Sequence, residues 1–119
     1  MSYDVQLYRI ETKEREEHKQ DKEFFDHEEN LEPFTAEQLQ DLKERLVQYA
    51  YVENRQDQYG THYKHAELGI TVLLTKHGLY FQTSGDQEAI FEIGMTASEF
   101  TDSGEFAKYD PQAGGWEKV

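Results

Sequence analysis

Five histidines invite a search for a metal site. His62 and His65 are separated by two residues, and on a strand this odd spacing sends them to opposite faces, so that they cannot both bind one ion. His18 and His27 lie in the acidic segment 11–32, where imidazole and carboxylate together can bind zinc or nickel. Because charge runs are usually solvated, we predict no metal site here, and a metal-binding or small-ligand module that uses His18 and His27 is the alternative.

Patterns for catalysis are absent from the sequence. The chain has no cysteine, which excludes thiol nucleophiles, thiolate zinc sites and iron–sulfur clusters together. No serine lies in G-x-S-x-G, and no phosphate-binding glycine motif or calcium loop occurs. We therefore predict a non-catalytic protein without a cofactor. An enzyme of unrecognised class, with paired carboxylates in a cleft, is a further alternative.

Net charge is the strongest constraint on partners. The 119 residues include 25 Asp and Glu against 12 Lys and Arg, which gives a net charge of −13. This excess argues against binding to nucleic acid and to anionic membranes, both of which require cationic side chains. A negative surface speeds association with a positive one, so we expect a basic protein partner. An immunity-like inhibitor or an adaptor is the function that fits.

Tyrosine is the second candidate for recognition, since aromatic side chains with a polar end are favoured at interfaces. An equally good interpretation is that these rings fill the edge of a small core and bond through their hydroxyls to the backbone. The predicted partner-binding residues combine acids of segment 11–32 with two tyrosines. They are Glu16, Glu17, Asp21, Glu28, Glu29, Tyr59 and Tyr63.

The elements that must position these residues belong to the α+β class. Thr35 and Gln38 match a capping box, and apolar residues recur at helical spacing from Leu39 onward, which predicts an amphipathic helix from about 36 to 49. The segment 11–25 is rich in helix formers but poor in apolar residues. It is therefore predicted as either a second, charged helix or a mobile loop.

Alternating and β-branched residues predict an antiparallel sheet of four to five strands, with the 36–49 helix packed on one face. The predicted strands are residues 3–10, 61–67, 70–75, the stretch after a turn at His77–Gly78, and 89–93. Residues 54–60 are predicted as a loop because they are polar and end in glycine. The aromatic residues of the last quarter are predicted to anchor an extended segment. No linker or repeat interrupts the chain, so we expect one domain over residues 1–119.

Two runs carry a resemblance. The opening MSYDVQLYRI and residues 91–117, FEIGMTASEFTDSGEFAKYDPQAGGWE, are similar to segments of a group of small, acidic, uncharacterised bacterial proteins. The resemblance implies a bacterial cytoplasmic protein and carries no activity. The chain also lacks a signal peptide pattern and any apolar run near the ~20 residues that cross a bilayer. We expect a cytoplasmic monomer or weak homodimer.

Overall fold

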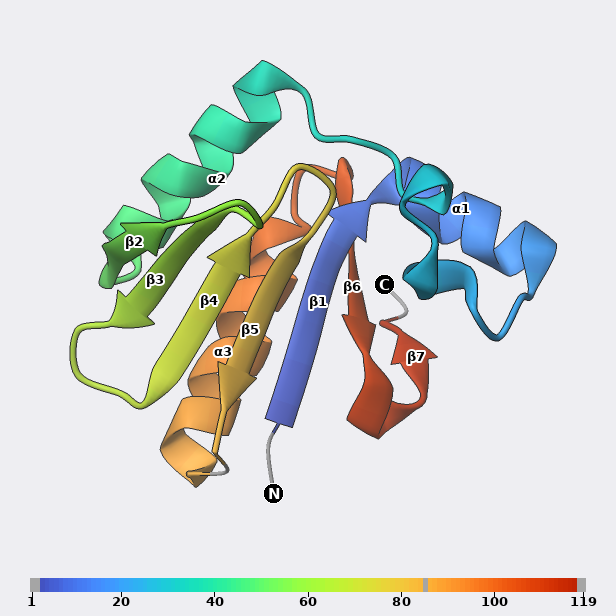
Figure 1. Cartoon of the computed structure of the whole chain (residues 1–119). Coiled ribbons are helices and arrows are strands. Elements are labelled where there is room, and N and C mark those ends of the chain that lie inside the picture. Colours follow the sequence, from blue (N-terminus) through green and yellow to red (C-terminus); the bar gives the residue numbers. More distant parts are fainter. Residues whose placement is uncertain (1–2, 85, 118–119) are drawn as a thin grey trace.

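A single antiparallel sheet organises the chain (Figure 1). The computed structural model describes residues 3–84 and 86–117. Its seven strands follow the order β2-β3-β4-β5-β1-β6-β7. The strands are β1 (Tyr3–Arg9), β2 (Tyr51–Gln56), β3 (Thr61–His65), β4 (Ile70–Leu74), β5 (Leu79–Thr83), β6 (Phe106–Asp110) and β7 (Gly115–Trp116). The α+β class and the antiparallel sheet are confirmed, whereas the predicted number of four to five strands is wrong.

The additional strands come from segments whose side chains gave no strand pattern. Strand β2 overlaps the predicted loop 54–60, and all its residues after Tyr51 are exposed because it forms one edge of the sheet. Strands β6 and β7 form within the predicted extended C-terminal segment. Backbone pairing at a sheet edge does not require apolar side chains, so these strands are invisible to a search for alternation.

Helices α2 (Ala36–Gln48) and α3 (Gln87–Phe100) cover one face of the sheet (Figure 1). The predicted capping box of α2 is present: the Gln38 backbone N–H donates to Thr35 Oγ1 at 3.0 Å, and the Thr35 N–H donates to Gln38 Oε1 at 3.0 Å. The predicted strand 89–93 is wrong, because these residues form the first half of α3. The Asp86 carboxylate caps this helix by accepting from the Glu88 N–H.

The main core lies between this helical layer and the sheet. Its central side chains are aliphatic and aromatic residues from every covering element. They include Val5, Leu7, Leu42, Leu46, Tyr51, Val72, Leu79, Phe81, Ile93 and Phe100, each at most 2% exposed.

Among the described residues, every helix is too short or too polar to span a bilayer.

The other face of the sheet is covered only in part, by a segment that we call the acidic arm (residues 10–32). The arm begins with helix α1 (Ile10–Lys19), which ends at Gln20 in a left-handed conformation, φ 50°. Two short 3₁₀ helices follow, η1 (Phe24–Asp26) and η2 (Glu28–Asn30). The helical alternative predicted for 11–25 is therefore present up to Lys19.

Candidate functional site

The sheet face that points away from α2 and α3 carries the candidate site. Successive strands place one residue each in a row across this face, as the pairing register shows. The row runs His62, Leu73, Tyr80, Gln6, Tyr109 and Trp116. Four of these six residues are apolar or aromatic, and two, His62 and Gln6, are polar.

Part of the row lies beneath the acidic arm, in a group of buried and partly buried residues that we call the aromatic cluster (Tyr8, Phe24, Phe25, Leu31, Tyr80, Tyr109 and Trp116). Phe24 is 0% exposed, and the ring of Phe25 stacks on Tyr8 at 5.1 Å and lies 4.8 Å from Tyr109. Desolvation raises the pKa of the Tyr8 hydroxyl above its ordinary value, so that this residue stays neutral.

Hydrogen bonds hold the acidic arm in this position. The Trp116 indole N–H donates to Glu16 Oε1 at 2.8 Å, and the Glu32 N–H donates to Thr12 Oγ1 at 2.9 Å. The buried Asn30 amide donates to the Phe24 carbonyl at 3.1 Å, and its oxygen accepts from Lys19 at 2.7 Å. The arm is thus a docked element of the structure, although it contains few apolar residues.

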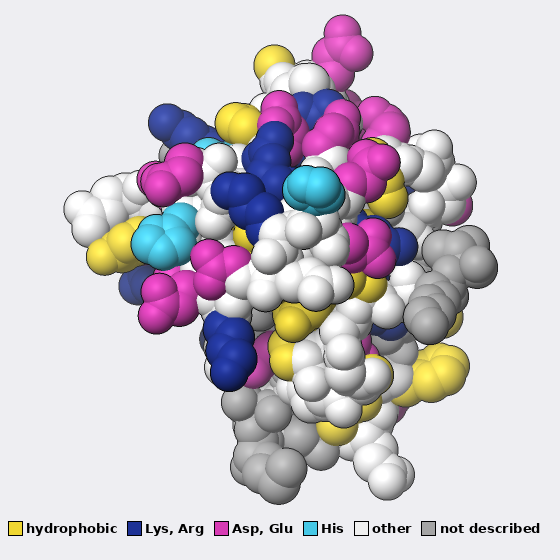
Figure 2. Space-filling model, turned by 90° about the vertical axis from the view of Figure 1, so that its right-hand side faces the viewer, with side chains coloured by type: hydrophobic (Ala, Val, Ile, Leu, Met, Phe, Trp, Pro, Cys, Tyr) yellow, Lys and Arg dark blue, Asp and Glu magenta, His cyan; other side chains and the backbone are white. Residues whose placement is uncertain are grey.

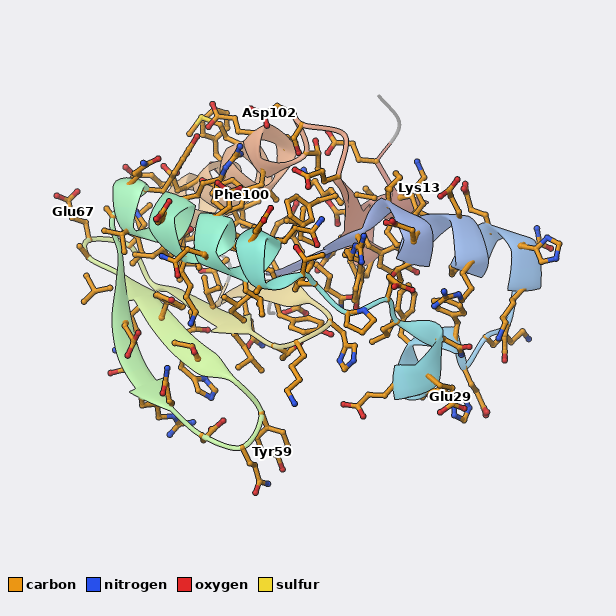
Figure 3. The ribbon with its side chains drawn as sticks, turned by 90° about the horizontal axis from the view of Figure 1, so that it is seen from above. Lys13, Glu29, Tyr59, Glu67, Phe100 and Asp102 are labelled. Carbon is orange, nitrogen blue, oxygen red and sulfur yellow. The ribbon has the colours of Figure 1, made fainter. Side chains whose placement is uncertain are left out.

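The row from His62 to Gln6 forms the floor of a groove, and Tyr80 belongs both to this floor and to the aromatic cluster. Two hollows, of about 550 Å³ and 290 Å³, share Leu73 and Tyr80 as lining residues and together form this groove. The acidic arm forms one wall through Phe25, Glu28 and Leu31. The turn between β2 and β3 forms the opposite wall, and Figure 3 shows Tyr59 at its tip, on the same side of the sheet as Glu29.

Local chemistry makes the β2–β3 wall rigid. The Asp57 carboxylate accepts from the Tyr59 and Gly60 backbone N–H groups, and His62 Nε2 lies 2.8 Å from its other oxygen. These bonds, led by that from Tyr59, hold the pKa of Asp57 below its ordinary value of 3.8. Gly60 lies so close to β4 that a Cβ would be 2.1 Å from the Leu74 carbonyl oxygen, so only glycine fits there.

The charges around the groove are mixed. Lys43, Lys76 and His77 line its end near the β4–β5 turn, while Glu28 stands on the arm with a carboxylate oxygen 4.0 Å from His77 Nδ1. Figure 2, which views the end of the molecule formed by the arm, shows Asp and Glu side chains around a central group of Lys and Arg. The end of the molecule formed by the arm is therefore rich in acids, whereas Gln6, Leu73 and Tyr80 on the groove floor carry no charge at neutral pH.

The structure brings together two of the sequence-predicted partner-binding residues and separates the others. Glu28 and Tyr59 line the same groove from opposite walls, and Tyr59 is 66% exposed. Glu17, Asp21 and Glu29 are exposed on the arm, whereas Glu16 is half-buried and bonded to Trp116.

Tyr63 lies elsewhere, because its position in β3 alternates with that of His62. Tyr63 points into the main core and is 2% exposed, so its ring does not reach the surface as a partner contact would require. The core interpretation of tyrosine, which the sequence left open, therefore holds at this position.

The histidines are dispersed. His62 and His65 lie on the same strand and on opposite faces, as their spacing predicts. His18 stands on α1, and His27 lies between η1 and η2 with Nε2 3.9 Å from a Glu23 oxygen. Within residues 3–84 and 86–117, no three His, Asp or Glu side chains gather in an arrangement that could hold a metal ion.

Several groove residues were not identified from the sequence. The sequence does not indicate whether the sheet face that carries Leu73 and Tyr80 is covered or open. Lys43 and Lys76 have no sequence pattern that distinguishes them from other solvated lysines. The one usable signal was alternation in β4 and β5, which puts Leu73 and Tyr80 on the face opposite the main core.

No protein-family model, curated protein or solved structure matches the chain. The geometry of the groove and the distribution of charge are therefore the basis for a functional assignment.

Proposed function

We propose that the chain is a non-catalytic recognition protein that holds a basic partner protein across the groove between the acidic arm and the β2–β3 turn. The observation that carries this proposal is the position of Glu28 and Tyr59. These residues are far apart in the sequence. Glu28 is predicted as a partner contact from its charge and Tyr59 from its aromatic ring, and the two line opposite walls of one groove of about 550 Å³.

The rims supply the two kinds of contact that a protein interface needs. Tyr59 offers a large ring with a polar tip, the type of side chain that dominates binding energy at interfaces. The arm offers carboxylates that are free to attract cations, because they are exposed to solvent. They are Glu14, Glu17, Asp21, Glu23, Asp26, Glu28 and Glu29. Such charges raise the association rate more than the final affinity.

The mixed charge of the groove offers the bound partner contacts of both signs. Basic residues of the partner would face Glu28 and its neighbours on the arm, where carboxylates predominate. Carbonyl or carboxylate groups of the partner would face Lys43 and Lys76, which line the same groove. An immunity-like inhibitor and an adaptor would both use such a surface, since neither requires chemistry from the groove.

Selection from a phage-displayed library of random peptides tests the proposal. Selected peptides should be enriched in Lys or Arg, bind with Kd in the micromolar range, and shift the NMR amide signals of residues 57–62 and 73–77. Tyr59→Ala should weaken binding about tenfold, because an aromatic anchor is lost. Glu28→Gln should weaken it less, by about two- to fivefold, and should reduce its dependence on salt.

Glu67→Gln is the matched control, because Glu67 is an exposed acid on the turn between β3 and β4, away from the groove (Figure 3). It removes the same charge as Glu28→Gln and should leave affinity unchanged. Peptides without basic enrichment, or peptides that bind wild type and Tyr59→Ala equally, would contradict the proposal.

A further inference from the structure

Helix α3 presents a second surface, on the sheet face opposite the groove (Figure 1). Its inner side is closed, since Ala89, Ile93 and Ala97 are each 0% exposed. Its outer side carries Phe91 and Met95 one turn apart, and they are 72% and 39% exposed. Among the residues that the structure describes, Phe91 is the most exposed large apolar side chain, so the centre of this helix faces solvent with an uncovered apolar pair.

A glycine lies beside this pair. Gly94 is in the middle of α3, where glycine destabilises a helix relative to alanine. A Cβ at this position would meet only Lys108 Nζ, at an ordinary contact distance of 3.8 Å, so nothing within the described chain excludes alanine. On the helix surface Gly94 is three residues from Phe91, so a residue without a side chain neighbours the ring.

Helix α3 itself carries charges of one sign, and the side chain of Lys108, next to Gly94, is only 10% exposed and lies 3.5 Å from Glu117. Helix α3 contains Glu88, Glu92 and Glu99 and neither Lys nor Arg. Glu88 and Glu99 are exposed on the flank of the helix next to Phe91 and Met95, and Asp102 follows just beyond its end. Glu99 accepts a hydrogen bond from Tyr49, and Arg45 Nη1 lies 3.4 Å from Asp102. Glu88 has no cationic partner among the described residues.

We propose that this outer face of α3 docks a basic amphipathic helix of a partner protein. An apolar side chain of that helix lies between Phe91 and Met95, the helix approaches closely over Gly94, and its Lys or Arg residues pair with Glu88 and Glu99. Helix-in-groove recognition uses this arrangement of spaced apolar anchors and complementary charge. A second copy of this chain fits poorly, because a symmetric contact of two α3 helices would oppose like charges.

The inference goes beyond the groove and does not depend on it, since no residue of α3 lines either hollow of the groove. A chain that carries both can hold two partners at once. This is the geometry of an adaptor.

A synthetic helical peptide of leucine and lysine, with leucine at helical spacing, is the probe. It should shift the NMR amide signals of α3, and a matched peptide with glutamate in place of lysine should not bind. Phe91→Ser keeps every charge and should weaken binding at least about tenfold. Gly94→Ala should raise the melting temperature of the protein and at the same time weaken peptide binding. If Gly94 had no role in docking, the substitution would change only the melting temperature.

Three results would overturn the proposal. The first is equal affinity of the peptide for wild type and for Phe91→Ser, which would show that a cationic peptide is attracted nonspecifically to an acidic protein. The second is absence of binding, or signal shifts confined to the acidic arm. The third is a wild-type dimer in light scattering that Phe91→Ser abolishes, which would assign the surface to a second copy. Tyr59→Ala should leave peptide binding at α3 unchanged, so failure here and failure at the groove are distinguishable.

Discussion

The two faces of this sheet are buried in different ways. Two long helices cover one face, and their aliphatic residues interlock with alternating strand residues such as Val72 and Leu79. The other face is covered by short 3₁₀ turns of the acidic arm, and burial there depends on a few large rings, with Phe24 and Phe25 packed against Tyr8. One face is closed along its length, and the other is closed over half.

This difference explains where the groove lies. A ring buries 150–250 Å² on its own, so about half a dozen aromatic residues can dock a segment that has almost no apolar stripe. The arm has no further aromatic residues to pack against the strands beyond Tyr80. These strands are therefore left uncovered on this face. Most acids of the arm are exposed at the surface, and Glu28 lines the opening.

The largest effect is expected where the closed face is densest. Phe81→Ala removes a ring that lies 5.8 Å from Tyr51 and 6.4 Å from Phe100 in the main core. The free energy of unfolding should fall by about 3–5 kcal/mol, because the lost burial adds to the energy of the cavity. Urea unfolding followed by circular dichroism measures this loss. Phe91→Ala, at an exposed position, is the control and should change stability by less than about 0.5 kcal/mol.

A smaller and more local effect is expected on the half-covered face. Phe24→Ala also removes a fully buried ring, but the loss cannot exceed the free energy that docks the arm, since the arm can detach while the sheet and its helices stay folded. We expect about 1–3 kcal/mol. Hydrogen exchange should show lost protection at Asn30 and Leu31, whose amides bond within the arm, and retained protection in β4.

Equal loss of protection in the arm and in β4 would break this comparison. It would mean that the arm and the sheet unfold as one unit, and that the aromatic cluster is as integral to the fold as the main core. His27→Ala serves as the control for the arm, because its side chain is about half exposed and lies outside the cluster.

The fold could be predicted from the sequence where local chemistry and burial agree. Helix α2 has a capping box and an apolar stripe, and β1, β4 and β5 alternate, so all four were found. Helix α3 was missed for a physical reason. Its inner side is built from small residues such as Ala89 and Ala97, while Phe91 and Met95 add apolar character to its outer side, so no stripe is visible.

The candidate site could be predicted less well, because tertiary pairing creates it. Charge and ring type selected Glu28 and Tyr59, which line the groove, and also Tyr63, which is buried in the main core. A one-residue alternation in β3 decides between the two faces of the sheet. The rest of the groove depends on how the arm folds back over β1 and β5, and nothing in the arm's local sequence specifies that path.

The smallest expected effect concerns the wall of the groove that faces the arm. The pKa of Asp57 lies below 3.8 in the folded state, chiefly because its carboxylate accepts the Tyr59 N–H and, after that, because of His62. The charged form therefore stabilises the folded turn at neutral pH, and this contribution disappears as pH falls through the folded-state pKa. The difference in melting temperature between wild type and Asp57→Asn should accordingly shrink on acidification. An NMR titration of the Asp57 carboxyl signal should give a midpoint below 3.8, and His62→Ala should raise that midpoint only part of the way, since the larger backbone contribution persists. A midpoint at the ordinary value in wild type would show that neither the backbone bonds nor His62 stabilises the carboxylate. Complete reversal in His62→Ala would show that the His62 contact alone accounts for the lowered pKa.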